Sequence, residues 1–119
     1  GYDHVIIDRY VRTKLTSTVS DSMRIYADST AEASNTTSTS GTILRAVDAD
    51  STIYHLNLAN NTLLWVTDDS VTHNPVDCEI RDLLFVERVG NINKILNVSM
   101  KLVSDEDTLA VAWTLTLRN

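Results

Sequence analysis

The sequence predicts an all-β fold, an antiparallel β-sandwich or barrel of about eight strands with a jelly-roll-like layout and little or no helix. The clearest observation comes from the end of the chain, where two alternating runs, Lys94–Leu102 and Thr108–Leu117, are joined by a short acidic connection. Apolar and small polar side chains alternate along both runs, and this period of two is typical of strands with one face in a core. Shorter runs of the same kind recur between turn-forming residues earlier in the chain. The predicted strands are His4–Arg12, Met23–Ala27, Thr42–Val47, Thr52–Leu58, Thr62–Thr67, Ile80–Val89, Lys94–Leu102 and Thr108–Leu117.

The connections between these strands are predicted from their turn residues. Ala59-Asn60-Asn61 is typical of a hairpin turn, because asparagine tolerates a left-handed backbone. The Ser/Thr-rich segment Asp28–Gly41 is expected to be a surface loop, and Asp68–Asp77, which holds the one proline, an irregular crossover. A single turn of helix is compatible with Ala31–Ser34 or with Cys78–Leu83.

Length and charge limit the possible functions. With 119 residues the chain is expected to form a single β domain over residues 1–119, large enough to have a core without disulfides. Its formal net charge is −6 and its Lys and Arg residues are scattered, so nucleic acid is not expected as a partner. No apolar run reaches the roughly 20 residues of a membrane span, so membrane insertion is not expected either. The chain starts without Met in strand-like sequence, which is what we expect of a domain cut from a longer protein.

No catalytic motif is present, and we expect a protein that is not an enzyme. The sequence lacks Gly-x-Ser-x-Gly, and its three glycines cannot form a phosphate-binding loop. His4, His55, His73 and Cys78 are too few and too widely spaced to indicate a zinc site. Cys78 is interpreted as a small buried apolar residue.

Three acidic turns supply the hard oxygen ligands that calcium prefers. If two of these turns met at one end of a sandwich, a surface calcium site would form, although no cofactor is required for the fold. The alternative is that they are ordinary solvated turns. The candidate ligands are Asp48, Asp50, Asp68, Asp69, Asp105 and Asp107.

The outward faces of the last two strands carry small uncharged side chains in place of the Lys and Glu that commonly protect exposed sheets. Such a face suits packing against a second copy of the chain, which would give a homodimer. The alternative is that the chain's own second sheet covers this face. The candidate interface residues are Asn97, Ser99, Ala112, Thr114 and Thr116.

Two other function classes stay open from the residues alone. A carbohydrate-binding or adhesin-like β-sandwich module of a secreted protein would use Trp65, Tyr54 and the acidic turns, whereas Trp113 is expected in the core. An enzyme with a cleft in a β-barrel would use His55 or His73 with a nearby Asp.

In its length, acidic Thr/Ser-rich composition, cysteine poverty and strand layout, ending in TLTLRN, the chain resembles the C-terminal protruding (spike) domain of shrimp and prawn nodavirus capsid proteins. The resemblance implies a module that dimerises into spikes on the capsid shell, on the outer surface of the virion. The missing N-terminal part of the coat protein would then package the genome. Calcium binding by the spikes of related fish nodaviruses adds interest to the acidic turns. Outer loops would contact a host-cell receptor or glycan, and the candidates here are Asn35, Thr36, Thr37, Asn60 and Asn61.

Overall fold

Two antiparallel sheets form the protein, which confirms the predicted all-β class. The computed structural model describes residues 2–59, 63–68, 71–74, 78–90, 93–105 and 107–117, with the backbone alone at 2–4, 14, 59, 63–65, 68 and 71–73. Strand order is β1-β3-β4-β5-β6 in the first sheet and β2-β7-β8-β9 in the second. Neither order closes on itself, so the fold is a sandwich and not a barrel. Most neighbouring strands are also consecutive along the chain, a simpler path than the crossings of a jelly roll.

The elements, in chain order, are α1 (Tyr2–Thr16), η1 (Ser20–Ser22), β1 (Arg24–Tyr26), α2 (Ser29–Ala33), β2 (Ser40–Gly41), β3 (Ile43–Val47), β4 (Ile53–Ala59), β5 (Leu63–Asp68), β6 (Val71–His73), β7 (Glu79–Val89), β8 (Lys94–Val103) and β9 (Thr108–Leu117).

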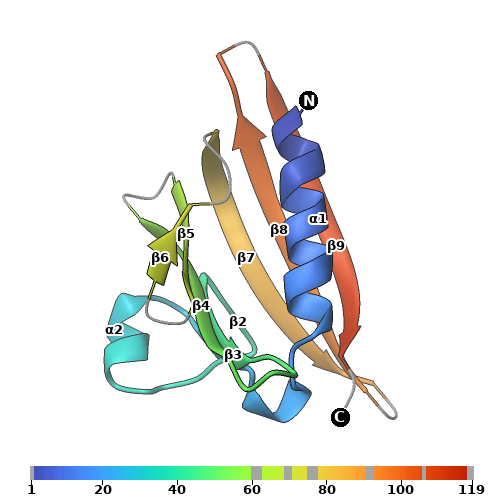
Figure 1. Cartoon of the computed structure of the whole chain (residues 1–119). Coiled ribbons are helices and arrows are strands. Elements are labelled where there is room, and N and C mark those ends of the chain that lie inside the picture. The colour runs from blue at the N-terminus through green and yellow to red at the C-terminus, as the bar shows by residue number, and fades with distance from the viewer. Residues whose placement is uncertain are drawn as a thin grey trace.

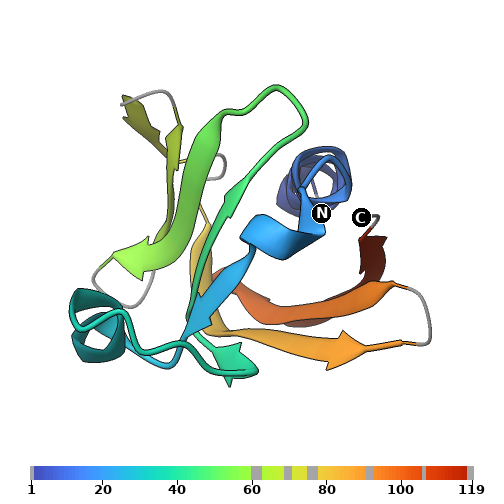
Figure 2. The same ribbon diagram turned by 90° about the horizontal axis from the view of Figure 1, so that it is seen from below.

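The two sheets are the sides of a wedge, and helix α1 lies in its mouth. Figure 1 shows α1 running along β8 and β9, and Figure 2 shows the five-stranded sheet and the four-stranded sheet meeting on the side away from that helix. One continuous core fills the wedge, with side chains from α1 and from both sheets. Helix α1, and not a further strand, therefore covers the core on the open side of the wedge.

Helix α1 overturns the predicted strand His4–Arg12, which is wrong. Ile7, Val11 and Leu15 are at most 1% exposed, and they follow the i, i+4, i+8 spacing of one helix face. Val5 is 53% exposed, although a strand over His4–Arg12 would put it on the same face as Ile7 and Val11. Within that run, residues 7 and 11 share a face in a strand and in a helix alike, so the deciding signal was Leu15, beyond the end of the predicted strand.

A tryptophan on the last strand fixes α1 to the four-stranded sheet. Trp113 is 5% exposed, which confirms its predicted place in the core. Its indole Nε1 donates to Asp8 Oδ1 of α1 at 2.6 Å, and the same oxygen accepts from Arg12 Nε at 3.0 Å. The bond joins residues near opposite ends of the sequence. It also satisfies the one polar group of an otherwise apolar side chain.

The terminal hairpin has the predicted alternation. Strands β8 and β9 pair without interruption from Lys94↔Leu117 to Val103↔Thr108. The predicted inward residues are buried with one exception, Leu109, which is 42% exposed at the start of β9. The buried ones are Leu96, Val98, Met100, Leu102, Val111, Trp113, Leu115 and Leu117.

Strand β7 contains an irregularity that the sequence did not reveal. Its pairing with β8 shifts register between Arg81 and Leu84, and Asp82 within this bulge has a left-handed backbone with φ of 55°. Leu83 and Phe85 are therefore buried, and Leu84 is 40% exposed. The helical turn considered for Cys78–Leu83 is wrong, since most of this segment belongs to β7.

The segment expected to be a plain surface loop, Asp28–Gly41, holds two short elements. Asp28 caps α2 by accepting from Ala31 N at 2.8 Å, so the helical turn expected near Ala31–Ser34 is confirmed close to its predicted place. Strand β2 pairs with β7, and a Cβ on Gly41 would lie 2.0 Å from the Tyr26 carbonyl oxygen. Only glycine allows this approach of two backbones. Strand β6, likewise, lies within the expected crossover Asp68–Asp77.

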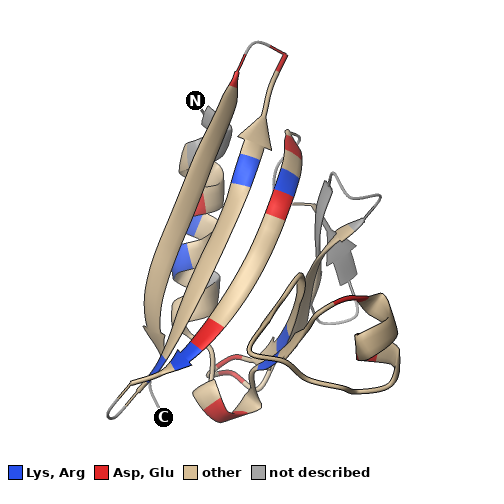
Figure 3. Cartoon of the chain, turned by 180° about the vertical axis from the view of Figure 1, so that it is seen from behind, with Lys and Arg blue, Asp and Glu red and all other residues tan. Residues whose placement is uncertain are grey.

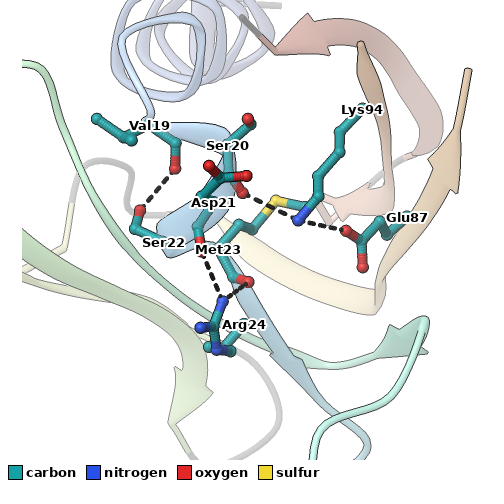
Figure 4. Close-up of polar contacts among 8 residues, drawn as sticks. All are labelled: Val19, Ser20, Asp21, Ser22, Met23, Arg24, Glu87 and Lys94. Atoms are coloured by element: carbon teal, nitrogen blue, oxygen red, sulfur yellow. Dashed lines mark hydrogen bonds and ion pairs between the residues drawn. The ribbon is translucent and has the colours of Figure 1, made fainter. Parts of the chain in front are cut away.

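A lysine ties η1 to the four-stranded sheet (Figure 4). Lys94 Nζ donates to the carbonyl oxygen of Ser20 at 3.2 Å and lies 3.2 Å from Glu87 Oε1. Ser20 is fully buried, so Lys94, and not water, supplies the hydrogen bond that its carbonyl oxygen needs. The turn that connects α1 to β1 is thus held against β7 and β8.

We expect Asp8→Ala to lower the free energy of unfolding by about 1–3 kcal/mol, because the buried Trp113 N–H loses its acceptor. Urea unfolding followed by tryptophan fluorescence measures the change. Asp50→Ala, at an exposed turn, is the matched control and should stay within about 0.5 kcal/mol of the parent. Equal effects of the two substitutions would contradict the role given to Asp8.

Candidate interaction surface

The outer face of the four-stranded sheet is the candidate functional surface. On β9 the side chains of Ala110, Ala112, Thr114 and Thr116 are exposed. The buried side chains of β8 and β9 point the other way, into the core that they share with α1 and the five-stranded sheet. The alternative that the chain's own second sheet covers the small-residue face is therefore excluded.

Strand β9 is also an open edge without charge. It is the last strand of its sheet, and its ten residues include no Lys, Arg, Asp or Glu. Figure 3 shows this strand without blue or red, whereas both colours occur along β7. Exposed edges and faces of sheets usually carry charges that discourage association. Along β9, both the face and the edge of the sheet therefore lack the charges that would discourage association.

A polar cluster occupies the middle of this face and includes two of the predicted interface residues. With the Asn97 amide oxygen toward β7, it accepts from Arg88 Nε at 3.3 Å and Nη2 at 2.9 Å. The amide nitrogen then donates to Thr114 Oγ1 at 3.0 Å. The guanidinium charge of Arg88 is thus held by a neutral acceptor, across strands β7, β8 and β9.

Beside this cluster the small side chains leave a hollow of about 270 Å³. Ser99, Ala110 and Ala112 line it, and the ion pair between Lys101 Nζ and Asp82 Oδ2, at 3.1 Å, lies at its rim. Ser99 and Ala112 are paired across the strands, and Ser99 is also paired with Leu84 of β7. The face thus presents an exposed leucine next to a hollow of suitable size for an apolar side chain.

The sequence identified the small residues of this face but missed the roles of four of its other members. Arg88, Leu84 and the Asp82–Lys101 pair depend on the β7–β8 register and on the bulge, which the sequence did not predict. Aligning the two strands about the turn near Gly90 would have placed Arg88 close to Asn97. Nothing in the sequence marks the bulge itself.

The acidic turns do not come together in the described residues. The turn with Asp48 and Asp50 follows β3, and Asp48 forms a bridge with Thr18, just after the lower end of α1. Asp105 and Asp107 follow β8 at its upper end (Figure 1). Helix α1 spans about 22 Å between these ends. The Asp68 side chain and Asp69 lie outside the described residues. Within the described part of the chain, no group of three His, Cys, Asp or Glu side chains could hold a metal ion.

The local contacts of these aspartates organise their turns. Asp48 Oδ1 accepts from Asp50 N at 2.9 Å and from Thr52 N at 3.0 Å. Asp107 Oδ1 accepts from Thr108 N at 2.8 Å. These are the hydrogen bonds of ordinary polar turn residues, the alternative to a calcium site.

The residues expected to face a receptor are only partly described. Asn35, Thr36 and Thr37 follow α2 and are exposed, whereas Asn60 and Asn61 lie outside the described residues. Asn35 has a φ of 53° and its Oδ1 accepts from Tyr26 Oη at 2.7 Å. Its side chain therefore holds the end of α2 to β1, which leaves Thr36 and Thr37 as the exposed tip.

The residues of the two other function classes are placed differently. Tyr54 is fully buried and its hydroxyl contacts Thr18, so it cannot stack on a sugar. The side chains of Trp65 and His73 lie outside the described residues. Cys78 is partly buried and packs against the core, as expected.

His55 is the one histidine in the described part of the chain whose side chain lies beside a carboxylate. Its Nε2 lies 2.8 Å from Glu32 Oε2, which joins α2 to β4. Burial lowers the pKa of His55 below its ordinary value of 6.5, and Arg45 on the neighbouring strand acts in the same direction. Glu32 acts against both, without reversing the shift. His55 is therefore neutral at pH 7.

Comparison with protein-family models, with curated proteins and with solved structures gave no match for this chain. Among the described helices, none has the length and apolar character needed to cross a membrane.

We expect the stability of the protein to fall as the pH drops below about 6.5, because the unfolded chain then binds a proton on His55 that the folded chain resists. Above that pH this contribution to stability is complete. In urea unfolding at a series of pH values, His55→Gln should have a smaller loss between about pH 7 and pH 5 than the parent.

Glu32→Gln is the matched control for the pH series. It removes the carboxylate that favours the imidazolium, so the pH-dependent loss should become larger than in the parent. An unchanged pH profile in His55→Gln would show that other groups cause the effect.

Proposed function

We propose that this chain is a non-enzymatic protruding domain of a viral capsid protein, which dimerises into surface spikes and contributes to host-cell attachment. The single observation that carries the proposal is the outer face of the four-stranded sheet, which no other part of the described chain covers. The resemblance to shrimp and prawn nodavirus spike domains supplies the viral context.

The chemistry of this face favours a second copy of the same chain. In a two-fold dimer each copy presents the same patch, so a charged patch would meet like charges. Here the side chains of β9 are uncharged and Lys101 is paired with Asp82, whereas Arg88 keeps its positive charge on the neutral Asn97 amide. Two copies with a formal charge of −6 each can therefore approach along β9 without bringing carboxylates together.

The shape of the face also suits close packing. Alanine, serine and threonine side chains are short, so two such sheets can lie near the usual spacing of about 10 Å. Leu84 of one copy can enter the hollow beside Ala112 of the other and so become desolvated. In the proposed dimer, Asn97, Ser99, Ala112, Thr114 and Thr116 form the contact.

Attachment is assigned to loops away from this face. Thr36 and Thr37 are exposed in the segment between α2 and β2. The proposed partners are the rest of the capsid shell and a host-cell receptor or glycan, and the proposed location is the outer surface of the virion.

Sedimentation velocity over a range of concentrations tests the dimer. We expect the parent chain to dimerise and Ala112→Glu to be monomeric, because the substitution puts two buried carboxylates at the contact. Ala49→Glu makes the same change at an exposed turn and should leave the dimer intact. Circular dichroism and thermal unfolding should show that both variants are folded.

The same experiment in calcium and in EDTA tests the metal. We expect the dimer to persist in EDTA, since the described acidic turns lie at opposite ends of each copy. A parent chain that stays monomeric at high micromolar concentration would contradict the proposed dimer. A dimer that survives Ala112→Glu would place the contact elsewhere.

A further inference from the structure

A second and larger hollow lies between the two sheets, on the side of the wedge next to α2. Its volume is about 650 Å³, within the range of about 300–1,000 Å³ that is usual for small-ligand sites. It is bounded by the start of α2, the start of β3, the end of β4 and the first half of β7. Ten of the described residues line it, and all of these except Asp82 lie outside the proposed dimer contact.

Part of this cleft is apolar. Ile43 is 5% exposed and Leu83 is 3% exposed, and both are buried among core residues. Leu58 is partly buried and packs against the same core. These three side chains give a ligand an apolar surface on which C–H groups can be desolvated.

The polar part carries charges that are already compensated. Glu79 Oε1 pairs with Arg81 Nη2 at 2.7 Å, and Asp82 Oδ2 pairs with Lys101 Nζ at 3.1 Å. Asp28 uses one oxygen to cap α2. A strongly charged ligand would have to compete with these bonds, whereas a neutral ligand can use the lone pairs and N–H groups that remain.

Asn57 adds an amide that has no hydrogen-bond partner among the described residues. It is half-buried at the end of β4 and lines the cleft, and its side chain has no hydrogen bond to any described residue. An amide offers two donors and one acceptor oxygen, so it can bond to a hydroxyl group in either sense. With Asp28, Glu79 and Asp82 as acceptors and Arg81 as donor, the cleft matches a ligand rich in hydroxyl groups.

We propose that this cleft binds a neutral polyhydroxylated ligand, such as one sugar residue of a glycan. Its hydroxyl groups donate to the carboxylates and accept from Arg81 and Asn57, while its C–H face packs on Leu58 and Leu83. Among the described residues the cleft shares only Asp82 with the hollow on the outer face, whereas Asn57, Leu58 and Leu83 line the cleft alone and can be changed without altering the proposed dimer contact. Either proposal can therefore fail alone.

Amide chemical shifts of the labelled protein test the site. The probes are galactose, mannose and N-acetylglucosamine, each titrated to tens of millimolar, with a lysine-rich peptide and a sulfated oligosaccharide as charged comparisons. We expect at least one neutral sugar to shift the amide signals of Ser29, Asn57 and Asp82. Absence of such shifts with all three sugars would overturn the proposal, and so would shifts at the cleft with only a charged probe.

Asn57→Ala should weaken the binding of the active sugar about three- to ten-fold, as expected for the loss of one or two hydrogen bonds. Asn93→Ala removes the same amide from the connection between β7 and β8, away from the cleft, and should leave the affinity unchanged. Both variants are first checked by their amide spectra for an intact fold. Equal affinity of Asn57→Ala and the parent would overturn the assignment of Asn57 to the site.

Discussion

The burial of one stripe of helix α1 in the wedge between the sheets is the interaction on which the rest of the structure depends. Ile7, Val11 and Leu15 are almost fully buried there. At about 2 kcal/mol each, their burial contributes roughly 6 kcal/mol before the cost in conformational entropy, which is comparable to the whole net stability of a small domain. The bond from Trp113 to Asp8 then sets the position of the helix along β9.

This placement of the helix also explains where the functional surfaces lie. Because α1 covers the inner side of β8 and β9, the apolar faces of both sheets are satisfied within one core. The chain has no further described element for the outside of the four-stranded sheet, so that side is open to a partner. The cleft beside Asn57 lies between the end of β4 and the first half of β7, next to the start of α2 and apart from the part of the core that α1 covers.

The sequence predicted the strands well where the alternation was long and failed where it was short. Along β8 and β9 an extended run of alternating residues fits a strand and no helix, so the inward residues could be named. Between residues 4 and 12 the same reasoning predicted a strand, but the segment is helical because Leu15, beyond that run, is buried on the same helix face as Ile7 and Val11. The small residues of the outer face were identified, but Arg88 and Leu84 depend on strand register and on a bulge. The cleft depends on the angle between the sheets, which no local pattern encodes.

The long-range bond between Asp8 and Trp113 has a consequence for the way the protein is made. Helix α1 precedes every strand of the domain along the chain, yet the surface that covers its apolar stripe is completed by β9. The core around Ile7 and Val11 is therefore complete only once β9 has been synthesised. Until then part of the apolar stripe of α1 is exposed, as is usual for folds that depend on contacts between residues distant in sequence.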